Sequence, residues 1–227
     1  MIRLGVLAVA PVLICLVYMY IRDKYEKEPW RLLATGVVIG AVLTFPIMQG
    51  EGFMMRFMPI TGQLGEAIYI SFAVAALVEE GFKFVVLYFL TWHNNNFNER
   101  LDGIVYAVFI SLGFAGVENV LYVFSPQMGG LETAFMRAVV SVPSHGFFGI
   151  IMGYYFALAK FEPQKRGRHL LSAFFAAWAV HGIYDVILLS GYTYGMVVFV
   201  PFLLVFWRNG LKKIKTHLEA SPFKTSA

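Results

Sequence analysis

The sequence is poor in cysteine and in charged residues, and both scarcities narrow what the protein can be. Cys15 is the one cysteine among 227 residues, so a disulfide framework within one chain is excluded. Asp, Glu, Lys and Arg make up 14% of the residues, whereas 59% are hydrophobic. Soluble domains carry about 25% charged residues, so the composition indicates a polytopic membrane protein instead.

The distribution of basic residues gives no sign of a nucleic-acid partner. The formal net charge is +4, but the Lys and Arg residues cluster between apolar runs, as they do in cytoplasmic loops. No Lys/Arg stripe alternates with exposed aromatic residues, which nucleic-acid binding requires. The expected surroundings are the lipid bilayer of a bacterial cell membrane.

The chain reads as a single integral domain, 1–227, of the all-α class. It has no repeat, linker or low-complexity tract, and its first apolar run lacks a small-residue cleavage site, so that run is expected to remain as a membrane helix. Since a bilayer core needs about 20 apolar residues per helix, the sequence predicts seven spans. These are about 4–21, 31–48, 67–91, 102–124, 136–159, 170–189 and 192–207.

The loops between the predicted spans differ in basic content, which predicts the orientation. The loops "RDKYEKEPWR" and "KFEPQKRGRH" and the tail "RNGLKKIKTH" are rich in Lys and Arg, and the alternate loops are poor in them. By the positive-inside rule, the N-terminus is expected outside and the C-terminus in the cytoplasm.

Charged residues stand near the middle of the third predicted span. Glu79, Glu80 and Lys83 lie in "LVEEGFK". A charged residue at a helix centre costs about 2.5–3.5 kcal/mol, so these side chains are expected to face one another or a water-filled cavity. At about 100° per residue, Lys83 lies within about 60° of both glutamates, which diverge from each other by about 100°. One carboxylate is therefore free to point at a reacting centre.

Three later spans supply ionisable residues at a similar depth, in their outer halves. Glu118 lies in the fourth span and His145 in the fifth, shortly after Pro143, which cannot donate to the helix ladder. His181 and Asp185 lie in the sixth at i,i+4, the spacing at which a carboxylate fixes an imidazole tautomer. Carboxylates that activate water, imidazoles that donate protons and a lysine that tunes them make a hydrolytic set.

Other intramembrane chemistries fit less well. The sequence contains no H-E-x-x-H motif of a zincin. Ser144 and His145 diverge by about 100° on a helix, so they are a poor nucleophile and base pair. Asp185 is the one aspartate well inside a span, which argues against an aspartyl dyad. The charged residues and glycines also have readings without a catalytic role. Glu79, Glu80 and Lys83 could form a structural ion pair, and Gly149 and Gly153 could serve helix packing.

The order of these motifs resembles that of the PrsW family of bacterial membrane proteases, over nearly the whole chain. The family's E-E-x-x-K matches Glu79, Glu80 and Lys83, its F-x-x-x-E matches Phe114 and Glu118, its later histidine matches His145, and its H-x-x-x-D matches His181 and Asp185. The motifs concerned are "YIRDKYEKEPW", "FPIM", "LVEEGFK", "DGIVYAVFISLGFAGVENVLY", "FMRAVVSVPSHGFFGIIMGYY" and "HGIYD".

This resemblance implies a site-1 protease that cuts a single-pass anti-sigma factor on its extracytoplasmic side and so starts a stress response. The family is also similar to the CAAX-processing and bacteriocin-immunity membrane proteases, whose motifs are E-E-x-x-x-R, F-x-x-x-H and H-x-x-x-N/D. Here Lys83 stands one residue earlier than that group's arginine, and Glu118 replaces its histidine.

The sequence leaves two hydrolytic mechanisms open. In one, Glu79 or Glu80 is the general base on a water, Lys83 keeps the other carboxylate ionised, and Asp185 orients His181. His145 and His181 then polarise the scissile carbonyl or protonate the leaving amine. In the other mechanism, a metal such as zinc is held with an open water position. The ligands would be Glu118, His145 and His181.

Two functions without hydrolysis remain as alternatives. Intramembrane carboxylates, lysine and histidine also build the relays of proton- or ion-coupled transporters, although repeat symmetry is missing. A non-catalytic membrane chaperone or immunity protein that binds a partner helix is the other. Cleavage of a single-pass substrate by purified protein separates these from a protease.

Overall fold

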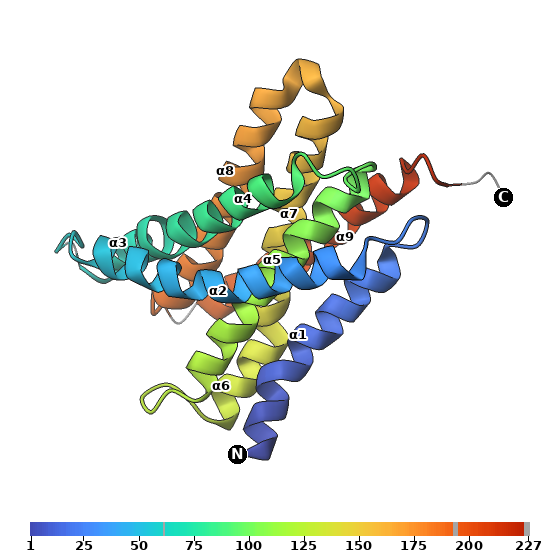
Figure 1. The fold of residues 1–227 in the computed structure, drawn as a ribbon. Coiled ribbons are helices and arrows are strands. Elements are labelled where there is room, and N and C mark those ends of the chain that lie inside the picture. Colours follow the sequence, from blue (N-terminus) through green and yellow to red (C-terminus); the bar gives the residue numbers. More distant parts are fainter. Residues whose placement is uncertain (61, 193–194, 225–227) are drawn as a thin grey trace.

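The computed structural model describes residues 1–60, 62–192 and 195–224, which form helices and no β-strand (Figure 1). The expected all-α class is confirmed. Two residues of the last predicted span, 193 and 194, lie outside the described part. The α-helices are α1 (Ile2–Arg22), α2 (Trp30–Met55), α3 (Gln63–Tyr69), α4 (Leu77–Thr91), α5 (Arg100–Val123), α6 (Leu131–Met136), α7 (Val142–Phe161), α8 (Arg166–Leu189) and α9 (Gly195–Glu219).

Two of the long helices change their winding partway along. The π-helical segment η1 (Ile70–Ala76) joins α3 to α4, and η2 (Arg137–Ser141) joins α6 to α7. Pro143 lies in the first turn of α7, directly after η2. π-helical turns are rare and often mark functional sites, and these two end shortly before Glu79 and His145.

Helix α5 lies at the centre of the bundle. It packs against α2 on one side and α7 on the other, and α2 crosses in front of it in Figure 1. The most apolar stretch of α5 is 72% buried, whereas that of α1 is 22% buried. Residues on α5 are therefore surrounded by protein, while α1 presents most of its side chains outward.

Glycines allow the helices on either side of α5 to approach its backbone. A Cβ on Gly113 would lie 2.2 Å from the carbonyl oxygen of Val37 in α2, and one on Gly153 would lie 2.2 Å from that of Gly103. No side chain fits at such distances, so both contacts require glycine. The packing interpretation of the Gly149 and Gly153 face is confirmed, since a Cβ on Gly149 would also meet the α5 backbone.

Five helices of the described residues are long and apolar enough to cross a membrane. The helix that holds the third predicted span, Gln63–Thr91, is continuous but contains Glu79, Glu80 and Lys83. The chain is a multi-pass membrane protein, while the count of seven spans and the orientation remain predictions. The five spans are Ile2–Arg22, Trp30–Met55, Arg100–Val123, Leu131–Phe161 and Pro163–Leu189.

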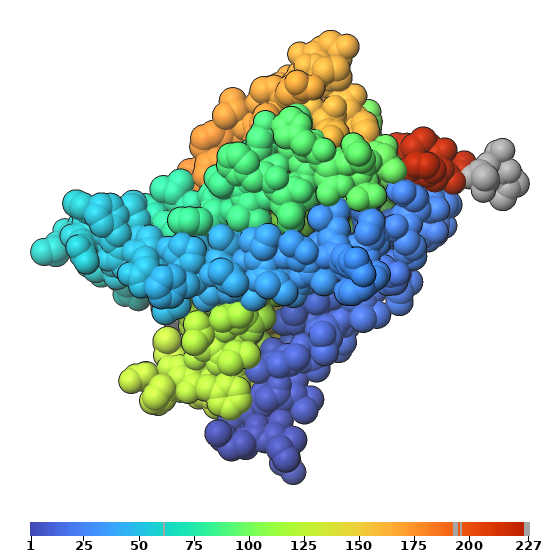
Figure 2. Space-filling view, in the orientation of Figure 1, coloured from blue at the N-terminus to red at the C-terminus, as the bar shows by residue number. Residues whose placement is uncertain are grey.

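The surface agrees with lipid surroundings. Val6, Leu13, Ile14 and Val17 of α1 are each more than half exposed. In Figure 2, α2 crosses the middle of the visible face, between α4 above it and α1 and the α5–α6 turn below. Apolar side chains at these positions suit a hydrocarbon environment.

Candidate active site

Lys83 lies at the centre of the ionisable residues of α4. Its Nζ is 2.8 Å from Glu79 Oε2 and 2.9 Å from Glu80 Oε1. The three residues are between 0% and 4% exposed, so their charges are compensated mainly by one another. The i,i+3 and i,i+4 pairing expected from the sequence is present.

His145 of α7 joins this group from the opposite side. Its Nδ1 lies 3.5 Å from Lys83 Nζ and 3.8 Å from Glu79 Oε2, and its Nε2 lies 3.0 Å from Glu118 Oε2. An ammonium can only donate, so Nδ1 faces Lys83 as an acceptor and Nε2–H donates to Glu118. One imidazole thereby connects α4, α5 and α7.

His181 of α8 lies between two carboxylates. Its Nδ1 is 2.9 Å from Glu80 Oε1, and its Nε2 is 3.3 Å from Asp185 Oδ2. Only the imidazolium form donates from both nitrogens. The contact between His181 and Asp185 that their spacing predicted is present, and the contact to Glu80 links α8 to α4.

Aromatic rings hold both imidazoles in place. Phe148 stacks on His181 with ring centroids 4.4 Å apart, and Phe114 meets His145 edge-on at 5.6 Å. Lys83 Nζ also lies 4.4 Å from the centroid of Phe114, within the range of a cation–π interaction. Phe114 of the F-x-x-x-E motif therefore contacts both the lysine and a histidine of the site.

Arg137 is a site residue that the sequence reasoning missed. Its Nη2 lies 2.6 Å from Glu118 Oε2, and its Nε donates to Asn119 Oδ1 at 3.0 Å. An arginine inside a predicted span was the available signal, because intramembrane charges normally have a partner. Glu118 therefore has a cationic partner as well as His145.

A cavity of about 520 Å³ adjoins these residues. Apolar side chains of α2, η1 and α8 complete its wall. The wall also contains Glu51 of α2, which, like Arg137, the sequence reasoning did not single out. Glu80 and Lys83 lie behind the wall, whereas Glu79 belongs to it. We call this space the site cavity; its ionisable wall residues are Glu51, Glu79, Glu118, Arg137, His145, His181 and Asp185.

The structure brings together a set of metal-ligand side chains that differs from the predicted set of Glu118, His145 and His181. Glu79, Glu80 and His181 each place one ligand-type atom within 4.8 Å of the others. Glu80 Oε2 is buried without a hydrogen-bond partner. In the described part of the chain, Glu118, His145 and His181 do not form such a group. Their use as ligands stays a prediction, beside the set that contains both α4 glutamates.

Comparison with known proteins points to one family. A family model described as "PrsW family intramembrane metalloprotease" matches residues 28–206. Protease PrsW of Clostridioides difficile (strain 630) is 37% identical over 221 residues, which are 96% of this chain and 92% of that protein. Protease PrsW of Bacillus subtilis (strain 168) is 36% identical over 210 residues, 91% of this chain and 92% of that one. No solved structure matches.

Proposed function

Because the chain belongs to the PrsW family of intramembrane metalloproteases, and is thus a membrane endopeptidase, we propose that the residues around the site cavity carry out its peptide hydrolysis. Family membership favours the protease over the transporter and chaperone alternatives. The observation that carries the proposal is the meeting of Glu79, His145 and His181, from three helices, at one cavity, with Lys83 behind its wall. We further propose that residues 1–227 act as one protease domain.

Glu79 is the general base of this proposal. It lines the site cavity, whereas Glu80 is fully buried between Lys83 and His181. A base must lie within hydrogen-bond reach of the water whose proton it accepts. Glu79 meets that requirement for a water in the cavity, and Glu80 then serves to hold Lys83 and His181.

Lys83 keeps the carboxylates ionised and does not need to touch the substrate. Its contacts to Glu79 and Glu80, at 2.8 and 2.9 Å, stabilise their charged forms. An ionised Glu79 can take a proton from water, and a protonated one cannot. The position of Lys83 behind the cavity wall suits this indirect role.

His181 is the donor toward the scissile peptide. Its Nε2 contact to Asp185, at 3.3 Å, is longer than its Nδ1 contact to Glu80, at 2.9 Å. Nε2–H can therefore turn toward a carbonyl oxygen at lower cost, while Glu80 keeps the ring oriented. His145 lies across from it, with a ring-centroid separation of 5.6 Å. Its Nδ1, 3.8 Å from Glu79 Oε2, takes over the proton that Glu79 accepts from water, and its Nε2–H gives a proton to the leaving amine.

The family description implies a metal, and part of the site fits one. Glu79, Glu80 and His181 would hold it, because their donor atoms converge and Glu80 Oε2 has no other partner. A divalent metal supplies Lewis acidity and lowers the pKa of bound water. Lys83 already contacts both carboxylates, so a metal and the ammonium would share them.

The substrate we propose is a single-pass membrane protein, an anti-sigma factor, cut on its extracytoplasmic side as the first step of a stress-signalling cascade. The resemblance of the motifs supports this choice. The predicted orientation, with the basic loops in the cytoplasm, puts the charged layer in the outer half of the membrane. A cavity of about 520 Å³ is within the size range of ligand sites.

Purified chain in detergent, mixed with a candidate anti-sigma factor, tests the proposal. Mass spectrometry of the products is expected to locate one cut on the extracytoplasmic side of the substrate's span. Exhaustive chelation followed by elemental analysis tests the metal: activity lost on chelation and restored by one metal supports it. Full activity in protein without bound metal would leave the glutamate mechanism alone.

A further inference from the structure

Buried carboxylates gather at the end of the bundle opposite to the site cavity. Asp23, Glu26 and Glu28 come from the turn between α1 and α2, and Glu99 and Asp102 come from the start of α5. All except Glu26 are between 0% and 2% exposed. Asp102 and the active-site Glu118 are separated by about 24 Å along α5, at 1.5 Å per residue.

The acidic cluster has no cation of its own. None of the five carboxylates forms an ion pair with a described Lys, Arg or His residue. Buried charges in proteins are normally paired or bound to a metal, so this group lacks a partner that its chemistry requires.

Four of the five carboxylates, all except Glu99, are held by one oxygen and free at the other. Asp102 Oδ2 accepts from the backbone N–H of Asn98 and Glu99, at 2.9 and 2.7 Å, while its Oδ1 is buried without a partner. Glu28 Oε2 accepts from the Tyr106 hydroxyl, and Glu28 Oε1 has no partner. Fixed carboxylates with open oxygens are prepared to receive a cation.

Two further carboxylates show the same pattern. Asp23 Oδ2 accepts from the Glu28 backbone N–H at 3.2 Å, and Glu26 Oε1 accepts from Asn98 Nδ2 at 3.2 Å. Asp23 Oδ1 and Glu26 Oε2 are buried and unpartnered. Glu26, Glu28 and Asp102 each place an oxygen within 4.8 Å of the others, a spacing that one ion can bridge.

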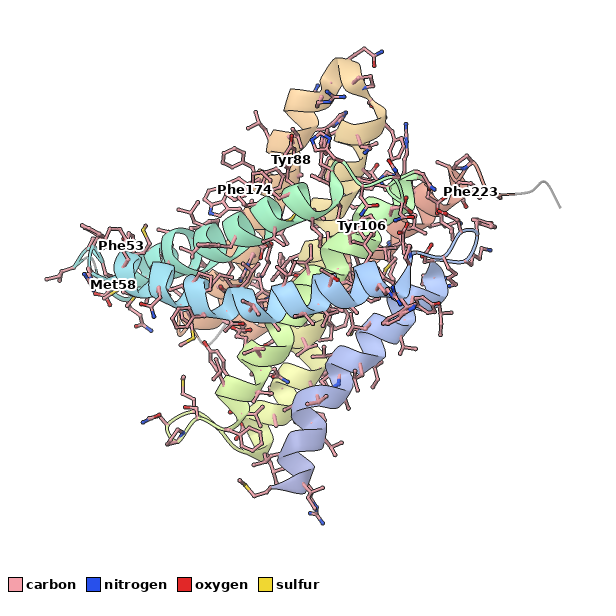
Figure 3. All side chains as sticks on the ribbon, viewed as in Figure 1. Phe53, Met58, Tyr88, Tyr106, Phe174 and Phe223 are labelled. Carbon is pink, nitrogen blue, oxygen red and sulfur yellow. The ribbon has the colours of Figure 1, made fainter. Side chains whose placement is uncertain are left out.

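We propose that Glu26, Glu28 and Asp102, with Asp23 beside them, form a second cation site that binds a hard divalent ion of the Mg²⁺ or Ca²⁺ type. The ligand atoms are all oxygens, which suits these ions and not zinc, whose sites favour nitrogen and sulfur. Figure 3 labels Tyr106 and Phe223 on the side where the α1–α2 turn, the start of α5 and the end of α9 come together. The ion therefore ties α1, α2 and α5 together on the side with the basic loops.

Terbium luminescence tests this site, because Tb³⁺ replaces hard divalent ions and emits when a nearby tyrosine or tryptophan is excited. Full-length protein in detergent, stripped with chelator, is titrated with Tb³⁺ and then with Mg²⁺ or Ca²⁺. We expect saturable emission and displacement by at least one of the two ions; the ion that displaces it at the lower concentration is the better ligand. Linear, non-saturating emission, or no displacement by either ion, would overturn the proposal.

Variants separate this site from the active site. Asp102→Asn and Glu28→Gln are each expected to weaken Tb³⁺ affinity about tenfold or more, whereas the exposed control Glu132→Gln leaves it unchanged. Unchanged affinity in both Asp102→Asn and Glu28→Gln contradicts the assignment.

A measurement on the wild type covers the case in which those two variants do not fold. Mg²⁺ or Ca²⁺ is expected to raise the unfolding temperature of the chelator-treated protein with a saturating dose dependence. Equal unfolding temperatures with and without either ion would count against the site.

Discussion

Replacing Lys83 by methionine removes the charge around which the candidate active site is built. The methionine keeps a chain of similar length, while Glu79 and Glu80 lose the ammonium 2.8 and 2.9 Å away. Two buried carboxylates then repel each other. One of them is expected to take up a proton, and a protonated Glu79 no longer serves as a base.

The size of the effect follows from the distances and the burial. With an effective dielectric constant of about 20, each contact near 2.8 Å is worth about 6 kcal/mol of attraction before desolvation. Removing one partner of a buried ion pair costs about 3–5 kcal/mol of stability. For catalysis we expect kcat to fall about 100-fold, as for loss of a general base. KM is expected to change little, because Lys83 does not line the site cavity.

Cleavage kinetics and thermal unfolding of the purified variant measure both effects. Lys215→Met is the matched control, since Lys215 is 70% exposed in its side chain and lies 3.7 Å from Glu219 in a surface pair. Surface pairs of this kind contribute little, so no measurable change is expected. Turnover at the wild-type rate in Lys83→Met would refute the role given to the ammonium.

Three further predictions concern contacts around the site and at the C-terminal helix. Arg137→Met leaves Glu118 without its cation and is expected to lower kcat/KM about tenfold; unchanged kinetics would make Arg137 dispensable. Gly153→Ala forces α5 and α7 apart and is expected to lower the free energy of unfolding by about 1–3 kcal/mol. Gly52→Ala, with nothing within 4 Å of the new Cβ, is the control. Equal unfolding temperatures for Gly153→Ala and the wild type would contradict the packing. His217 lies beyond the last predicted span, and burial lowers its pKa from 6.5 to about 4. Between these pH values the unfolded chain binds a proton that the folded chain excludes, so the free energy of unfolding is expected to fall as the pH drops from about 6.5 to about 4. His217→Gln should flatten that dependence, and an identical pH profile in the variant would count against it.

Local spacing allowed the pairs within single helices to be predicted. The contacts of Lys83 with Glu79 and Glu80, and of His181 with Asp185, follow from helical geometry. Their meeting was expected because charged groups in hydrocarbon must face one another. The spacing of residues along a helix does not determine how that helix is rotated about its axis relative to its neighbours. The contact of His181 Nδ1 with Glu80 could therefore not be predicted from the sequence.

Features that depend on packing between helices escaped the sequence analysis. The π-helical segments η1 and η2 rotate the site residues that follow them, and no residue pattern in the chain predicts such a turn. Arg137 is the second residue of its predicted span, and Glu51 lies three residues beyond the end of its own, so both stand where charged side chains are commonly solvated. The acidic cluster combines a turn between α1 and α2 with the start of α5, which only the folded chain brings together.

Turnover of a single-pass substrate by Glu79→Gln protein tests the central claim most directly. The variant keeps the size of the side chain and removes its ability to accept a proton, so the account predicts a fall in kcat of about 100-fold or more. Glu132→Gln, an exposed glutamate of α6, provides the control and should retain the wild-type rate. Wild-type turnover in correctly folded Glu79→Gln protein would contradict the assignment of Glu79 as the base at the site cavity.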